Sequence, residues 1–145
     1  MTKRRGQCLC GAVSVIADVT GEIQACHCVQ CQRWTGGGPL LSARASQAEV
    51  TGGDEVLSYL ASKWGVRVGC GTGGSTLWWK MQGKPATYVA VGLLDDQSDL
   101  TVTEEIFVDY RPAWLPPFDG ATQSTEAQEI AKLEEHLTQQ QETQQ

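Results

Sequence analysis

Two groups of cysteines are the residues of this chain best suited to chemistry. Cys8 and Cys10 are one residue apart, and Cys26, Cys28 and Cys31 fall within six positions. Sulfurs at such spacings on a tight turn can point at one tetrahedral ion, since Zn–S bonds of roughly 2.3 Å tolerate a compact turn. The spacing therefore predicts zinc binding.

The run from residue 26 to 31 has the composition of a catalytic zinc site. It offers three cysteines without a fourth ligand nearby, which leaves one corner of a tetrahedral ion for water or substrate. A thiol entering that corner would be held as a thiolate, which can attack an electrophilic carbon. His27 lies between Cys26 and Cys28, so its ring is expected to point away from the ion. Packing, substrate contact and acid–base catalysis all stay open for it.

Other uses of the six cysteines compete with metal binding. Disulfides would suit a secreted chain, but no apolar segment follows the charged N-terminus as in a secretion signal. A reducing cytosol is the expected setting, and there clustered thiols more often bind metal. Disulfides between the groups remain geometrically open, as do redox thiols and inert buried cysteines.

Charge is unevenly distributed along the chain. The formal net charge is -6, yet residues 1–118 carry 11 acidic and 10 basic side chains, while residues 119–145 carry 6 acidic and 1 basic. A nearly neutral body offers little to phosphate backbones, so nucleic acid is not an expected partner. No stretch approaches the roughly 18 to 20 apolar residues that cross a bilayer. We expect a soluble, cytoplasmic protein without a membrane partner.

Short strands are expected to position the cysteines within one domain, because 145 residues suit a single core. The glycine-rich segment 35–39 predicts a loop beside the second cysteine group. Segments rich in alternating, β-branched or aromatic residues, bounded by turn residues, predict strands at 12–17, 40–43, 49–51, 56–60, 66–68, 76–80, 87–91 and 104–108.

The C-terminal residues predict a helix. Thr125 to Gln128 fits a capping box, and Ile130, Leu133 and Leu137 follow at helical spacing. We therefore expect a zinc-binding domain at 1–120 and an acidic, Gln-rich helical tail at 121–145. The tail is either solvated or packed on a partner chain, for example in a homo-oligomer formed through this helix.

Several segments together resemble the glutathione-dependent formaldehyde-activating enzyme family, which includes centromere protein V. The resemblance runs from about residue 5 to 118, and its segments are 6–11, 26–31, 67–78, 106–108 and 111–114. It implies a mainly β fold, the β-tent zinc fold of short antiparallel strands. It also implies two zinc ions, one structural and one held by Cys26, Cys28 and Cys31.

The chain departs from the family pattern at one position. In the family, Cys8 and Cys10 would join a later Cys-x-x-Cys-Gly pair, but here that motif has Cys70 followed by Gly73 in place of its second cysteine. Three outcomes stay open: zinc held by three cysteines with a water or a neighbouring side chain, a weakly held ion, or no metal. Since the loss of one thiolate lowers the affinity of a site for zinc, we expect the ion at Cys26, Cys28 and Cys31 to be present more consistently than the other ion.

The resemblance implies a zinc-dependent carbon–sulfur lyase or synthase, similar to S-(hydroxymethyl)glutathione synthase. Its substrates would be a glutathione-like thiol and formaldehyde or another aldehyde, and Cys26, Cys28 and Cys31 would be the catalytic ligands. The alternative is a non-catalytic, zinc-stabilised protein-binding module. Candidates to bind a substrate carboxylate are Arg33, Lys63, Arg67 and Lys80, which could instead be ordinary surface cations. Candidates to line a pocket are Trp34, Trp78 and Trp79, which could instead pack in the core or on the sheet.

Overall fold

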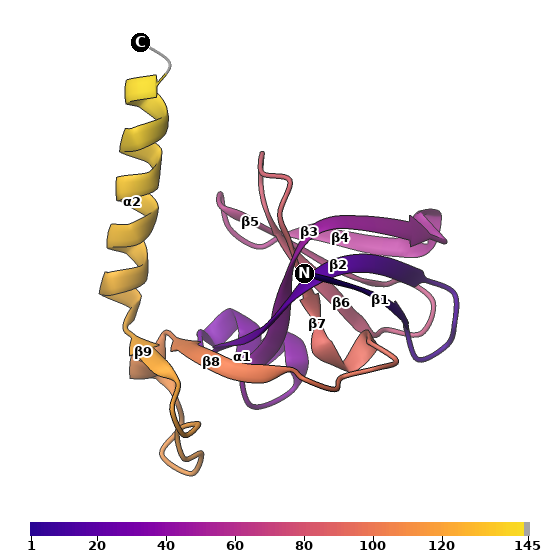
Figure 1. Ribbon diagram of the computed structural model, residues 1–145, viewed down its shortest axis with the longest axis horizontal. Coiled ribbons are helices and arrows are strands. Elements are labelled where there is room, and N and C mark those ends of the chain that lie inside the picture. Colours follow the sequence, from indigo (N-terminus) through magenta and orange to yellow (C-terminus); the bar gives the residue numbers. More distant parts are fainter. Residues whose placement is uncertain (144–145) are drawn as a thin grey trace.

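A nine-stranded sheet dominates the computed structural model, which describes the backbone of residues 1–143 and the side chains of residues 1–138 (Figure 1). The strand order is β4-β5-β6-β7-β3-β2-β8-β9, and β1 joins β2 outside this path. The helices are α1 (Val29–Thr35) and α2 (Glu126–Thr143). The strands are β1 (Thr2–Gln7), β2 (Ser14–Cys26), β3 (Leu40–Thr51), β4 (Val56–Leu60), β5 (Gly65–Cys70), β6 (Thr76–Met81), β7 (Thr87–Ala90), β8 (Thr101–Ile106) and β9 (Thr122–Ser124).

Strand β2 links the two cysteine groups. It begins four residues after Cys10 and ends at Cys26. Its first half pairs antiparallel with β1, its second half pairs parallel with β8, and β3 pairs along both halves. The register shifts between Asp18 and Ile23, where the partner on one edge changes from β1 to β8. One long strand therefore carries a cysteine group near each end.

The prediction of a mainly β protein is confirmed, with some differences in its strands. Segments 40–43 and 49–51 belong to one strand, β3, and the strand expected at 104–108 runs from Thr101 to Ile106. It ends there because Phe107 has a φ of 57°, which no strand accommodates. Pairing is mostly antiparallel, as expected, but the β2–β8 and β8–β9 pairs are parallel.

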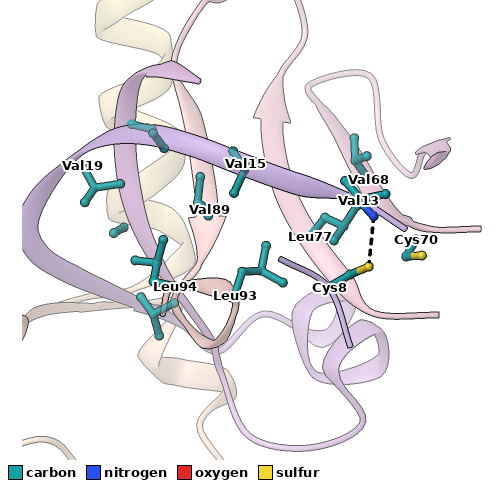
Figure 2. Packing of buried hydrophobic residues seen from close by; sticks show 14 residues of the cluster. Cys8, Val13, Val15, Val19, Val68, Cys70, Leu77, Val89, Leu93 and Leu94 are labelled. Carbon is teal, nitrogen blue, oxygen red and sulfur yellow. Dashed lines mark hydrogen bonds between the residues drawn. The ribbon is translucent and has the colours of Figure 1, made fainter. Parts of the chain in front are cut away.

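Buried apolar side chains between residues 8 and 94 form the main core (Figure 2). Val15, Ala17 and Val19 alternate inward along β2, and they pack with the fully buried Leu77 and Val89. Figure 2 shows two cysteines, Cys8 and Cys70, at one end of this cluster. A smaller cluster contains two others, together with Leu40 and Ile106. Each cysteine group is thus anchored in packed apolar surroundings.

The C-terminal helix forms as predicted. The Gln128 backbone N–H donates to Thr125 Oγ1 at 3.3 Å, and the Thr125 N–H donates to Gln128 Oε1 at 2.8 Å, which is the reciprocal pattern of a capping box. In Figure 1, α2 stands apart from the strands and continues from β9. Because β9 pairs with β8, residues 122–124 extend the sheet, and the boundary at residue 120 stays a prediction.

Neither helix within residues 1–143 combines the length and the hydrophobicity that a membrane span requires.

Candidate metal centres

Cys26, Cys28 and Cys31 bring their sulfurs together where β2 passes into α1. Cys26 is the last residue of β2, Cys28 is the N-cap of α1, and Cys31 lies in the first turn. The Cys31 backbone N–H donates to the Cys28 sulfur at 3.3 Å, so this sulfur caps the helix in place of the usual side-chain oxygen. The three Sγ atoms lie within 4.8 Å of one another. We call these residues the 26–31 cluster.

Access to the 26–31 cluster is one-sided. Cys26 and Cys31 are buried, whereas Cys28 is half-buried and is followed by the exposed Val29 and Gln30. A small molecule from solvent would therefore approach beside Cys28.

Arg67 of β5 contacts the 26–31 cluster through its guanidinium group. Nη1 donates to Cys31 Sγ at 3.4 Å, and Nη2 donates to Gln30 Oε1 at 3.2 Å and to Cys28 Sγ at 3.9 Å. The guanidinium carbon lies 5.1 Å from the centroid of the Trp34 ring. With Arg67 only 7% exposed, its charge acts on the sulfurs with little screening by water. The arginine offsets negative charge on the thiolates.

Cys8, Cys10 and Cys70 form the second group, the 8–10–70 cluster. The Sγ atoms of Cys8 and Cys10 are 3.6 Å apart, and those of Cys10 and Cys70 are also 3.6 Å apart. Four sulfurs around a tetrahedral zinc ion at roughly 2.3 Å would lie roughly 3.8 Å from one another. The Val13 N–H donates to Cys8 Sγ, and the Gly73 N–H donates to Cys70 Sγ, each at 3.3 Å.

The donor sets of both clusters fit a soft metal ion. All six cysteines are free, and a separation of 3.6 Å is far beyond the roughly 2.05 Å of a disulfide. Three thiolates in one place select zinc-like ions over hard cations such as Mg²⁺. Each cluster can therefore hold a metal ion, and within residues 1–138 no disulfide competes for its sulfurs.

The sulfurs of each cluster shift one another's pKa. Hydrogen bonds with Cys26 and Cys31 lower the pKa of Cys28, and the bonds with Cys28 and Cys31 raise the pKa of Cys26. In the other cluster, the Val13 N–H lowers the pKa of Cys8 to about 7, against the opposing effect of burial. In the metal-free 26–31 cluster these shifts favour negative charge on Cys28, and binding a metal there would release thiol protons.

His27 points away from the sulfurs and is fully buried, in agreement with the expected direction of its ring. Its Nε2 is 2.8 Å from Glu105 Oε1. The same carboxylate accepts hydrogen bonds from Arg111 Nη1 at 3.1 Å and from the Phe118 N–H at 3.0 Å. Sequence reasoning missed Glu105, because an acidic residue within a strand gives no sign that it is completely buried.

A family model described as glutathione-dependent formaldehyde-activating enzyme matches residues 3–110. The chain belongs to this family. The match spans both cysteine clusters and Arg67, and it ends before β9 and α2. The resemblance inferred from the cysteine motifs is therefore confirmed.

Comparison with solved structures shows that another protein shares the fold of this chain. A crystal structure of a protein from Rhodobacter sphaeroides matches with a TM-score of 0.56 and 22% sequence identity, over 83% of this chain and 99% of that one. At this identity the likeness concerns the fold alone. A search of curated proteins gave no match.

The other candidate site residues lie in different surroundings. Arg33, Lys63 and Lys80 are exposed, whereas Trp34 and Trp79 pack against the smaller apolar cluster, which includes Cys26 and Cys31. Trp78 packs against the main core instead. Arg67 was a candidate to bind a substrate carboxylate, but its Nη atoms donate to the chain's own sulfurs and to Gln30.

Proposed function

We propose that this chain is a zinc-dependent carbon–sulfur lyase or synthase that joins a small thiol such as glutathione to formaldehyde or a related aldehyde. The observation that carries this proposal is the 26–31 cluster. Three sulfurs converge there, and no fourth Cys, His, Asp or Glu ligand joins them among the described residues. Half-buried Cys28 leaves the site open to a reactant. Family membership supports the same reaction class.

The reaction itself is an addition to a carbonyl group. The thiol sulfur forms a bond to the aldehyde carbon, the C=O π electrons move to the oxygen, and that oxygen takes up the proton lost by the thiol. The reverse reaction releases thiol and aldehyde. A bound zinc ion would supply the positive charge that favours a thiolate at neutral pH.

The chain's own residues hold and tune this site. Cys26, Cys28 and Cys31 would hold the ion, and Arg67 donates hydrogen bonds to two of these sulfurs. Such bonds withdraw charge from a thiolate and fix its position. Trp34 covers one face of the Arg67 guanidinium and keeps it in place.

Carboxylates of a glutathione-like thiol need cations at the edge of the site. Arg33 lies on α1, and Lys63 lies in the β4–β5 loop next to Trp64. Gln30 of α1 donates to the backbone oxygen of Ala61 at 3.4 Å, which joins this loop to the helix. Both cations are exposed, and we propose them as the first contacts for substrate carboxylates.

Exchange NMR with glutathione and formaldehyde tests the proposed activity. The zinc-loaded protein should raise the rate of adduct exchange above the spontaneous rate, and Cys28→Ser should abolish the increase. Cys10→Ser, a change at the other cluster, is the matched control and should retain it. Equal rates with and without protein would remove the proposal.

A second function is favoured by α2. This helix stands apart from the sheet, and its Ile130 side chain is 45% exposed. A surface helix normally buries its apolar stripe. We propose that α2 binds a second copy of the chain, which would make it an assembly element outside the segment that matches the family model. A non-catalytic binding module would use the same surface.

A further inference from the structure

The 8–10–70 cluster lacks a fourth ligand from the chain. Among the described residues, no other Cys, His, Asp or Glu places a ligand atom with its three sulfurs. Two hydroxyl groups that follow Cys70 in sequence are engaged elsewhere: Thr72 Oγ1 donates to Glu55 Oε2 at 2.8 Å, and Ser75 Oγ accepts from the Leu9 N–H at 3.0 Å. A tetrahedral ion held here therefore has one position left over.

Gly73 lies next to Cys10 of this cluster. A Cβ atom added to Gly73 would lie 2.9 Å from both Cβ and Sγ of Cys10, so a side chain at residue 73 would point at the cluster and would fit only if Cys10 shifted. Gly73 is exposed, and so are Cys10 and Leu9 beside it. The side chain of Cys10 thus occupies the space beside Gly73, and it faces solvent there.

The surroundings suit an additional sulfur. Backbone N–H groups of Val13 and Gly73 already donate to Cys8 and Cys70, and such donors spread the negative charge of metal-bound thiolates. A soft ion with three thiolates prefers sulfur to oxygen as its next ligand. Exposed Cys10 gives a small molecule from solvent access to the cluster.

We propose that the 8–10–70 cluster holds a zinc-like ion whose fourth ligand is exchangeable, and that this position takes a small external thiol. In the absence of thiol, water fills it. The site is separate from the 26–31 cluster and does not depend on the proposed lyase activity. An ion held in this way exchanges faster than one enclosed by four protein sulfurs.

Cobalt binding to the full-length protein tests this proposal, because Co²⁺ takes the place of zinc and its sulfur charge-transfer absorption reports bound thiolates. We expect the wild type to bind two equivalents of Co²⁺. Adding 2-mercaptoethanol should raise the absorption of the wild type more than that of Gly73→Cys, whose own sulfur fills the fourth position at this cluster. The response that both proteins share comes from the 26–31 cluster.

Metal release to a chelator provides the second measurement. One equivalent of metal should leave the wild type quickly, and Gly73→Cys should slow this release by about tenfold or more. Changes in the groups around a metal ion alter the affinity of its site by a similar factor. Gly73→Ala makes the same close approach to Cys10 without adding a sulfur and should not slow the release. Cys10→Ser should bind a single equivalent.

Three results would overturn the proposal. They are a wild type that binds only one Co²⁺ ion, a thiol response that is the same in wild type and Gly73→Cys, and two wild-type ions that leave equally slowly with no effect of Gly73→Cys. Each of these results can arise whether or not the protein accelerates adduct exchange between glutathione and formaldehyde. Failure of the proposal for the 8–10–70 cluster is therefore distinguishable from failure of the proposed activity.

Discussion

The imidazole of His27 and the carboxylate of Glu105 form a hydrogen bond of 2.8 Å in a place from which water is fully excluded. His27 follows Cys26 at the end of β2, and Glu105 lies in the parallel neighbour β8. The backbone N–H of His27 also donates to the Ile106 carbonyl at 3.0 Å. Together these bonds fix the backbone between Cys26 and Cys28 and thereby position two of the three sulfurs.

Replacing Glu105 with alanine should destabilise the protein. The change leaves a buried imidazole and the Arg111 guanidinium without their shared acceptor, and removing one partner of a buried pair costs about 3 to 5 kcal/mol. Urea unfolding of the zinc-loaded protein measures the free energy of unfolding. Glu104→Ala is the matched control. Among the described residues the Glu104 side chain accepts one hydrogen bond, from Gln24, so this variant should lose about 1 kcal/mol of unfolding free energy. Equal losses in both variants would contradict this role.

The Glu105 carboxylate should also make the free energy of unfolding depend on pH. Burial alone would raise the pKa of Glu105, but the bonds from His27, the Phe118 N–H and Arg111 outweigh it and lower the pKa. A lowered pKa stabilises the fold fully above the ordinary glutamate value, and this stability is lost as pH falls through the folded pKa. The difference in unfolding free energy between wild type and Glu105→Gln should therefore shrink from pH 7 to pH 4. A constant difference would count against the interpretation.

Arg67 should strengthen the metal site through the sulfurs it contacts. Arg67→Met removes the donors to Cys28 and Cys31 and should weaken metal binding at the 26–31 cluster by about 10- to 100-fold. Competition with a chromophoric chelator measures this affinity. Arg33→Met, an exposed change on α1, should have no effect. An equal response of the two variants would show that overall charge, rather than contact, matters.

Removing α2 should change the oligomeric state. Truncation after Ser124 keeps β9 paired with β8 and deletes the helix. Light scattering should show a dimer for the full chain and a monomer for the truncated one. Ile130→Ser should weaken the dimer, whereas Glu135→Ser, on an exposed polar residue of the same helix, should not. A monomeric full chain would exclude self-association through α2.

Much of the fold follows from local sequence patterns. Alternation along residues 12–17 predicts the first part of β2, and the capping box at Thr125 predicts α2, because each pattern has its own geometric cause. Parallel pairing of β8 with β2 and β9 is not encoded locally and appears only when distant segments meet. Strand β1 was also missed, since its exposed, charged residues resemble a loop.

The candidate site divides in the same way. Spacing alone identifies Cys26, Cys28 and Cys31, because one turn brings them together. Arg67 and Glu105 reach the site through strand pairing across the sheet, so no local signal separates Arg67 from an exposed cation such as Arg33. The importance of Gly73 was visible only because its position in a recurring motif is normally a cysteine.

Anomalous diffraction at the zinc edge, from crystals of protein purified without added metal, tests the central claim most directly. We predict a strong peak within bonding distance of Cys26, Cys28 and Cys31, and a weaker one among Cys8, Cys10 and Cys70. Absence of a peak at the 26–31 cluster, in protein that retains its fold, would contradict a zinc site there.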